Sequence, residues 1–324
     1  MTLDRILAAF PKMSALVIGD ICLDRWCTYD PALAEPSRET GLPRVAVTST
    51  EVTPGAGGTV ASNLAALGVG RVEVLGVMGG DGFGVDLCAA LDARGIGSGR
   101  LLGVPGLQTF TYTKLINART GVEDLPRLDI VNARPLEPSV ERPLLDSIQS
   151  AVDDFDVILI ADQAETGAGG AITPAVRELL TDLAFAYADK VFFADSRNRI
   201  EQFRRVIVKP NQQEAETACQ KLFGRIDYVA LRKCLDSRLL LVTHGPRGVL
   251  LVDDAGERWV ETRAAGNPVD ICGAGDSFSA GAAMALAVTG SPDEAARFGN
   301  LVAGVTIMKK GTGTASPEEL LAAG

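Results

Sequence analysis

The fold of this chain is best understood from one stretch, Val269-Asp270-Ile271-Cys272-Gly273-Ala274-Gly275-Asp276-Ser277-Phe278. Three small residues precede a carboxylate, and a helical pattern of small residues then runs from Ser277 to Val288. The backbone N–H groups of Gly273, Ala274 and Gly275 would be open at the positive end of that helix, where they can bind a phosphate or another oxyanion. Asp276 would lie at the same place and could take a proton from an attacking hydroxyl. An anion site beside a base indicates phosphoryl transfer.

The composition limits the class of protein. The chain has 324 residues, 47% of them hydrophobic, which is enough to bury a large core. Its formal net charge of −10 argues against general binding to nucleic acids or anionic membranes, although a local pocket can still be positive. Six scattered cysteines and one histidine, His244, argue against a zinc site and indicate a reduced, cytoplasmic protein. The N-terminal apolar run is too short for a signal peptide, and the longest apolar or small run, Ala280–Val288, is about half of a bilayer span.

Short apolar runs alternate with amphipathic segments along most of the chain. The predicted strands are 14–20, 72–77, 156–160, 190–194, 206–208 and 239–242. The predicted helices are 60–67, 85–94, 174–187, 212–219 and 228–235. This alternation predicts an α/β fold with a parallel sheet that helices cover on both faces, and with ligands at the carboxyl ends of the strands. Polar residues follow those ends, namely Asp20, Asp24, Asp162, Asp195, Asn211 and Thr243.

Three further segments predict strands that lie outside this alternation. They are Pro43–Thr48, Thr109–Ile116 and Arg127–Val131, which alternate Thr, Tyr and Val with other residues. They would form a small β-lid, contributed by about residues 26–50 and 107–132, within a single domain of residues 1–324. The lid is interpreted either as a flap over a substrate pocket or as a structural edge or dimer contact, and the two are compatible.

A glycine-rich segment, 54–68, forms the second motif. Gly55, Gly57 and Gly58 precede a helix of small residues. They would either let the backbone approach a polyhydroxylated ligand, with Thr59 or Asn63 adding a hydrogen bond, or allow tight packing of helix against sheet. The pattern is not G-x-G-x-x-G after a strand, so a dinucleotide site is poorly supported.

Together, the segments 54–68 and 270–276 resemble the two signatures of the PfkB, or ribokinase-like, carbohydrate kinases. Supporting matches follow in the family's order at Gly79–Gly84, Lys209–Glu214, Val242–Gly248 and Gly311–Pro317. Within that family the strongest likeness is to kinase domains acting on D-glycero-D-manno-heptose 7-phosphate, carried by segments 19–26, 37–43, 113–115, 127–129 and 311–320. The resemblance implies a ribokinase-like α/β fold, with a central, mostly parallel sheet and a small inserted β-lid. It also implies an ATP-dependent sugar kinase, which could form a homodimer through the lid.

The resemblance implies a role for each matching residue. Asp276 would be the base, and the N–H groups of Gly273, Ala274 and Gly275 the anion hole. The substrate would contact Asp20, Asp24, Gly55, Gly57, Gly58, Thr59, Asn63, Lys114 and Arg127. ATP would contact Asn211, Thr243, Gly245, Gly248, Gly273, Gly275 and Asn300. Asn211 and Glu214 would hold Mg²⁺ through water, and Asp270 a monovalent cation, K⁺.

Some positions depart from the family pattern, and some signals have a plainer interpretation. Thr59 stands where an asparagine is common, and Glu165 lies in a stretch where the heptose kinases carry a lysine. Asn211 and Glu214 also fit an ordinary helix-capping arrangement. The alternatives for function are the same chemistry on fructose, ribose or a nucleoside, or a pseudokinase that senses sugar or nucleotide. Because no nucleotidyltransferase domain follows residue 324, we expect kinase chemistry alone.

Overall fold

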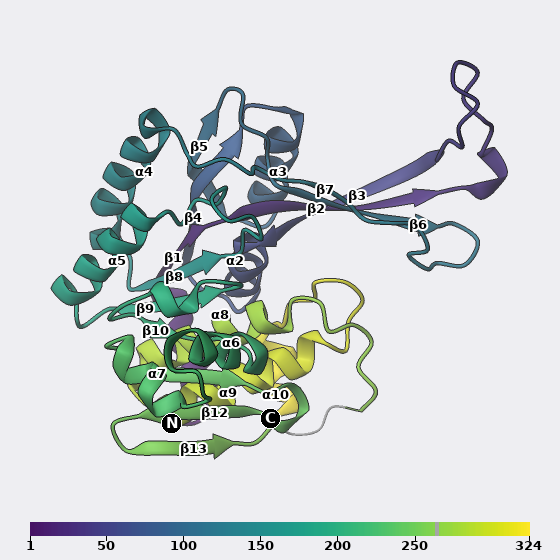
Figure 1. The fold of residues 1–324 in the computed structure, drawn as a ribbon. Helices are drawn as coiled ribbons and strands as arrows, with labels where there is room; N and C mark the ends of the chain where they lie inside the picture. The colour runs from purple at the N-terminus through teal and green to yellow at the C-terminus, as the bar shows by residue number, and fades with distance from the viewer. Residues whose placement is uncertain (263–265) are drawn as a thin grey trace.

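The computed structural model describes residues 1–262 and 266–324 and has a nine-stranded sheet at its centre (Figure 1). The strand order is β13-β12-β11-β10-β9-β8-β1-β4-β5. Pairing is parallel from β11 to β5, and β12 and β13 are antiparallel. The bounds are β1 (Ser14–Gly19), β4 (Arg71–Gly79), β5 (Gly97–Val104), β8 (Val157–Asp162), β9 (Val191–Ser196), β10 (Ile207–Val208), β11 (Leu240–Thr243), β12 (Val249–Asp253) and β13 (Gly256–Val260).

Helices cover both faces because the central strands are apolar on both sides. In β1, Ala15 and Val17 belong to one core cluster and Leu16 and Ile18 to the other, as the alternation of side chains along a strand requires. The first cluster includes α1 (Leu3–Ala9), α2 (Gly57–Ala66), α3 (Gly82–Asp92), α8 (Ala274–Thr289), α9 (Pro292–Thr306) and α10 (Pro317–Ala323). The second includes α4 (Pro138–Ala151), α5 (Pro174–Ala186), α6 (Gln212–Phe223) and α7 (Tyr228–Cys234). This arrangement confirms the predicted α/β fold class.

A separate four-stranded sheet projects from the body as an arm (Figure 1). Its order is β3-β2-β6-β7, with β2 paired antiparallel to β3 and parallel to β6. The bounds are β2 (Ile21–Tyr29), β3 (Val47–Ala56), β6 (Thr111–Asn117) and β7 (Leu128–Ile130). A single residue, Asp20, separates β1 from β2, so the arm begins where the central strand ends.

The first lid strand differs from its prediction. Residues 43–46 form no strand, and β3 begins at Val47. Pro43 has no N–H to donate to a ladder. The segment is held instead by a hydrogen bond from the Asp30 N–H to the Ala46 carbonyl and by one from the Arg44 guanidinium to the Leu33 carbonyl. Earlier in the chain, β2 begins at Ile21 and carries Asp24 within a strand. Asp24 therefore lies on the lid instead of following the first strand of the main sheet.

Helix α8 lies close against α9 because small residues line the contact. A Cβ added at Gly281 would lie 2.8 Å from Val302 Cγ2, and one at Gly299 would lie 2.8 Å from Phe278 Cε2. Helix α8 also contacts β8 and β9. Within the described residues, the helices all lack the combined length and apolarity of a membrane span.

Candidate active site

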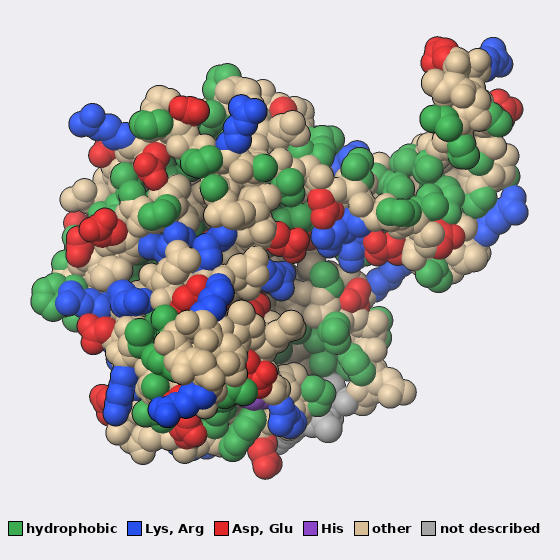
Figure 2. Space-filling view, in the orientation of Figure 1, with side chains coloured by type: hydrophobic (Ala, Val, Ile, Leu, Met, Phe, Trp, Pro, Cys, Tyr) green, Lys and Arg blue, Asp and Glu red, His purple; other side chains and the backbone are tan. Residues whose placement is uncertain are grey.

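A cleft lies between the lid and the first turn of α8. Charged side chains of both signs gather where the arm meets the body (Figure 2). Lid residues line one side, namely Asp24, Arg25, Trp26, Tyr112, Lys114 and Arg127. The other side is formed by Ala56, Thr59, Gln163, Glu165, Arg197, Cys272, Gly273, Asp276 and Thr312. Six predicted site residues therefore meet here, namely Asp24, Thr59, Lys114, Arg127, Gly273 and Asp276.

Asp276 is in the first turn of α8 and is half-buried. Burial, and after it the neighbouring Asp195, raise the pKa of its carboxyl to about 7, although Lys209 and Arg197 oppose the shift. A base with a pKa near the working pH can accept a proton and is deprotonated often enough to do so. The geometry and the pKa both suit a general base.

The turn before α8 opens fewer N–H groups than predicted. Gly273 has φ 77° and ψ 6°, a left-handed conformation that glycine adopts easily. The Ala274 N–H donates to the Ile271 carbonyl at 3.2 Å, which removes Ala274 from the predicted anion hole. Within the described chain, the N–H groups of Gly273 and Gly275 have no acceptor. Of the three predicted amides, those of Gly273 and Gly275 are therefore open at the positive end of the helix and that of Ala274 is not.

Asp24 faces the cleft from strand β2. Burial raises the pKa of its carboxyl to about 6, although Lys114 and Arg127 act in the opposite direction. Gly55 lies against this carboxylate, since a Cβ there would be 2.5 Å from Asp24 Oδ1. Gly55 therefore makes room for Asp24 and does not itself line the cleft.

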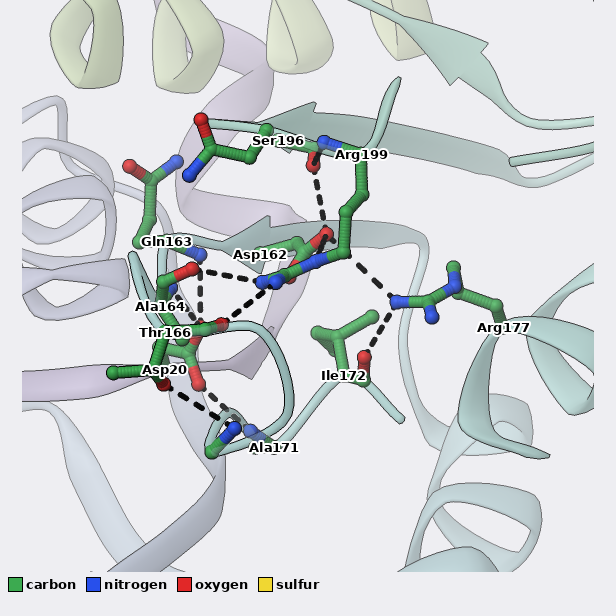
Figure 3. A network of polar contacts seen from close by, with 12 residues as sticks. Asp20, Asp162, Gln163, Ala164, Thr166, Ala171, Ile172, Arg177, Ser196 and Arg199 are labelled. Atoms are coloured by element: carbon green, nitrogen blue, oxygen red, sulfur yellow. Dashed lines mark hydrogen bonds and ion pairs between the residues drawn. The ribbon is translucent and has the colours of Figure 1, made fainter. Parts of the chain in front are cut away.

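Asp20 has a different place from the one predicted (Figure 3). Its carboxylate is 2% exposed and accepts hydrogen bonds from the N–H groups of Gln163, Ala164 and Ala171, each at 2.8 Å. Burial raises its pKa to about 6, and the neighbouring Asp162 adds to the shift. Asp20 holds a loop of the body and does not reach the cleft.

Arg199 holds the same loop from the other side (Figure 3). Its guanidinium pairs with the fully buried carboxylate of Asp162, with Nη2 2.6 Å from Oδ1. It also donates to the carbonyls of Ala164 and Thr166. This clamp presents Gln163 and Glu165 to the cleft. The sequence gives no signal for it because its members are far apart along the chain.

Most of the glycine-rich segment serves packing. A Cβ at Gly57 would lie 2.7 Å from Ile21 Cδ1, and one at Gly58 would lie 2.5 Å from Pro54 Cβ. Asn63 is fully buried and donates to the Thr59 carbonyl at 3.0 Å. Of the residues that this segment offered for substrate contact, Thr59 alone lines the cleft in the described structure.

Ala56, which stands where the family resemblance leads us to expect the second glycine of a pair, is strained. It has φ 52° and ψ −120°, a conformation that favours glycine, and its side chain lines the cleft.

We expect Ala56→Gly to raise the free energy of unfolding by about 1 kcal/mol, because relief of backbone strain exceeds the added entropy of the unfolded chain. Urea denaturation would measure the change. The matched control is Ala89→Gly on the exposed side of α3, which should lower stability by about 1 kcal/mol. A loss at Ala56 equal to that control would contradict the strain.

The predicted nucleotide residues gather at the ends of β10, β11 and β13. Thr243 forms an isolated bridge with Asn211, and its N–H donates to the Pro210 carbonyl. Gly248 has φ 92°, and a Cβ there would lie 2.2 Å from the Val260 carbonyl oxygen. Asn300 Nδ2 donates to that same oxygen at 3.3 Å. Gly245, with φ 57°, is exposed in the same turn.

Asn211 and Glu214 form the capping box that the sequence allowed. The Asn211 side chain accepts from the Glu214 N–H at 2.9 Å, and Glu214 Oε2 accepts from the Asn211 N–H at 2.8 Å. Burial and Asp195 raise the pKa of Glu214. The residues that the structure describes contain no group of three His, Cys, Asp or Glu side chains able to hold a metal. The donors fit Mg²⁺, which keeps several waters and uses only one or two protein carboxylates.

Asp270 connects two segments beside the turn. Oδ1 accepts from the Cys272 N–H at 2.9 Å, and Oδ2 accepts from the Gly311 N–H at 3.1 Å. Its carboxylate thus fixes the backbone that leads into the turn at Gly273.

Comparison with known proteins identifies relatives across nearly the whole chain. A protein named bifunctional protein HldE from Shewanella loihica is 32% identical over 323 residues, covering 98% of this chain and 64% of that protein. The protein of the same name from Trichlorobacter lovleyi is 30% identical, covering 96% of this chain and 62% of its own length. The chain therefore spans less than two thirds of the length of these relatives.

Solved structures share the fold. Ribokinase from Thermotoga maritima aligns with a TM-score of 0.70 at 20% identity, covering 96% of this chain and 99% of that one. Phosphofructokinase-2 from Escherichia coli, in complex with potassium, aligns with a TM-score of 0.71 at 19% identity, covering 96% and 98%. The model of the pfkB family of carbohydrate kinases matches residues 14–319. The chain belongs to the pfkB family, and it is a sugar kinase with a ribokinase-like fold.

Proposed function

We propose that this kinase transfers the γ-phosphoryl of ATP to a hydroxyl of a sugar that already carries a phosphate, with D-glycero-D-manno-heptose 7-phosphate as the first candidate. The observation that carries the proposal is the state of two cations in the cleft. Lys114 and Arg197 line it, and neither forms an ion pair with any described carboxylate. Arg127, by contrast, is bound by both oxygens of Asp129. Unpaired cations in a chain of net charge −10 favour an anionic ligand.

The transfer itself uses the start of α8. Asp276 accepts the proton of the attacking hydroxyl, and the N–H groups of Gly273 and Gly275 stabilise the charge on the transferring group. Asn211 and Glu214 would hold Mg²⁺ through water, and bound Mg²⁺ would neutralise phosphate charge. Asp270 and the neighbouring carbonyls would hold K⁺. Activity that survives removal of Mg²⁺, or replacement of K⁺ by tetramethylammonium, would refute the corresponding assignment.

The lid lies close to the body at the mouth of the cleft. A Cβ at Gly311 would be 3.6 Å from Trp26 Cζ2, and Lys114 Nζ lies 4.3 Å from the centre of the Trp26 ring. An aromatic side chain placed here would exclude water from the transferring group and suppress ATP hydrolysis.

Release of ADP in the presence of different acceptors tests the substrate class. We expect heptose 7-phosphate, or another sugar phosphate, to exceed fructose, ribose and nucleosides in kcat/KM by at least tenfold, since a charge-assisted hydrogen bond contributes about 1.5–3 kcal/mol. Lys114→Met and Arg197→Met should each reduce kcat/KM for the phosphorylated sugar far more than for the neutral sugars, since only the phosphorylated sugar loses a charged contact. Equal turnover of neutral sugars would refute the phosphate preference. Binding of sugar or nucleotide without ADP release would favour the pseudokinase.

We also propose that the lid pairs with a second copy of this chain. Exposed apolar side chains lie along the arm (Figure 2), namely Leu33, Leu42, Val45, Val47, Val122, Leu128 and Val131. Light scattering should give the mass of a dimer at micromolar concentration, and Leu42→Glu with Leu128→Glu should give a monomer. A wild-type chain that is monomeric at every concentration would contradict the pairing.

All six cysteines are free, which supports a reducing, cytoplasmic setting.

A further inference from the structure

A buried ion pair lies behind the phosphate-binding turn, where the reaction has no evident use for it. Lys209 is 3% exposed and Asp195 is 8% exposed. Lys209 Nζ lies 2.7 Å from Asp195 Oδ2, and the Ser279 hydroxyl reaches the same oxygen at 3.5 Å. Asp195 is near the end of β9 and Lys209 directly follows β10. Buried ion pairs are costly to form, so one beside an active site calls for a functional explanation.

The lysine ammonium lies directly against the turn. A Cβ added at Gly275 would be 3.2 Å from Lys209 Nζ, so the place of a side chain at Gly275 is taken by the ammonium. Gly275 carries one of the open N–H groups, and the next residue is Asp276. Lys209 is almost wholly enclosed, so it acts on the turn through its charge and not by contact with ligand.

The two charges of the pair act on Asp276 with opposite signs. Asp195 disfavours the ionised form of Asp276 and Lys209 favours it, with Arg197 adding to Lys209 and Asp24 to Asp195. Glu214 also faces Lys209 from α6. Lys209 Nζ lies 2.7 Å from the Asp195 carboxylate, and an opposite charge this close favours the charged form of the lysine. The ammonium therefore stays charged.

We propose that the Asp195–Lys209 pair is a positioning element of the active site. Lys209 holds a positive charge beneath the turn at Gly275, and Asp195 fixes the lysine side chain in place and partly offsets its charge. This inference rests on the proposed role of Asp276 as base. Lys209 keeps Asp276 available as a base near neutral pH and adds to the field that stabilises the transferring phosphoryl. Asp195 prevents the ammonium from moving toward Asp276 and neutralising it as a fixed ion pair.

The test compares the pH dependence of kcat/KM in four forms of the full chain, namely wild type, Lys209→Met, Asp195→Asn and the double variant. In the wild type we expect the rate to fall as pH drops through about 7, where Asp276 becomes protonated. We call this fall in rate the acid limb of the pH profile. Lys209→Met should move the midpoint of the acid limb to a pH about one unit higher or more, and Asp195→Asn should move it to a pH about one unit lower. The double variant should return to within about half a unit of wild type, because both charges are gone. Direct titration of the Asp276 carboxyl by ¹³C NMR gives the same three shifts in a variant that is too slow to assay.

Opposite shifts with recovery in the double variant support the inference, since a merely structural role would move both single variants the same way. Coincident limbs in all four forms would overturn it. If instead the acid limb of the wild type persisted in Asp276→Asn, the assignment of Asp276 as the base would be wrong. The two failures are therefore distinguishable.

Discussion

Asp276→Asn should lower kcat by about 10²–10⁴-fold, the usual contribution of a general base. The asparagine side chain has nearly the same shape, so ATP and sugar should bind with little change. The variant should also lose the pH dependence of the wild type. In the wild type, burial raises the pKa of Asp276 to about 7, so activity is present above that pH and is lost as pH falls through it. Single-turnover transfer of ³²P to sugar measures the chemical step.

The control for this variant is Asp86→Asn, the same substitution at an exposed position of α3. It should leave kcat within about twofold of wild type, as surface changes usually do. A variant at position 276 that keeps the wild-type rate would remove Asp276 from the reaction and leave it only a helix-terminal acid.

Arg199→Met should lower the free energy of unfolding by about 3–5 kcal/mol, because it leaves the Asp162 carboxylate buried without its main partner. Asp162 is fully buried and Arg199 nearly so, and Arg177 lies farther away, with its Nη1 3.9 Å from Asp162 Oδ2. Urea denaturation would measure the change. The double variant Asp162→Asn with Arg199→Met should recover much of the loss, because no uncompensated charge remains.

An exposed pair provides the control. Arg225 Nη2 lies 2.9 Å from Asp227 Oδ2, but the Arg225 side chain is 73% exposed. Arg225→Met should therefore cost no more than about 1 kcal/mol. If Arg199→Met cost as little as Arg225→Met, the loop at Gln163–Ala171 would not depend on this clamp.

Local periodicity was enough to predict the central sheet and most of the helices. It failed where the pattern is interrupted. Strand β5 contains Gly97, Gly99 and Gly103, which weaken a strand signal, and β5 lies at an edge of the sheet. Helix α4 contains Pro143 in its interior. Proline usually breaks a helix, yet this segment buries Leu144 and Ile148 against the core.

The site was predictable where one short motif carries it, as at Gly273–Asp276. It was not predictable where the role depends on partners far along the chain. Asp20 and Asp24 have the same charge and are four residues apart, but backbone N–H groups from a loop about 140 residues away occupy Asp20 alone. Lys209 lies within a recognised segment, yet its place beneath Gly275 follows only from how β10 and α8 meet in space.

The single-residue junction between β1 and β2 has a mechanical consequence. The backbone of Asp20 connects the body to the arm. Its carboxylate accepts the hydrogen bonds that hold the loop carrying Glu165. The arm and the loop thus share one pivot. A rotation of the arm about this residue would therefore also displace the loop. The two walls of the cleft are mechanically coupled, and we expect them to move together.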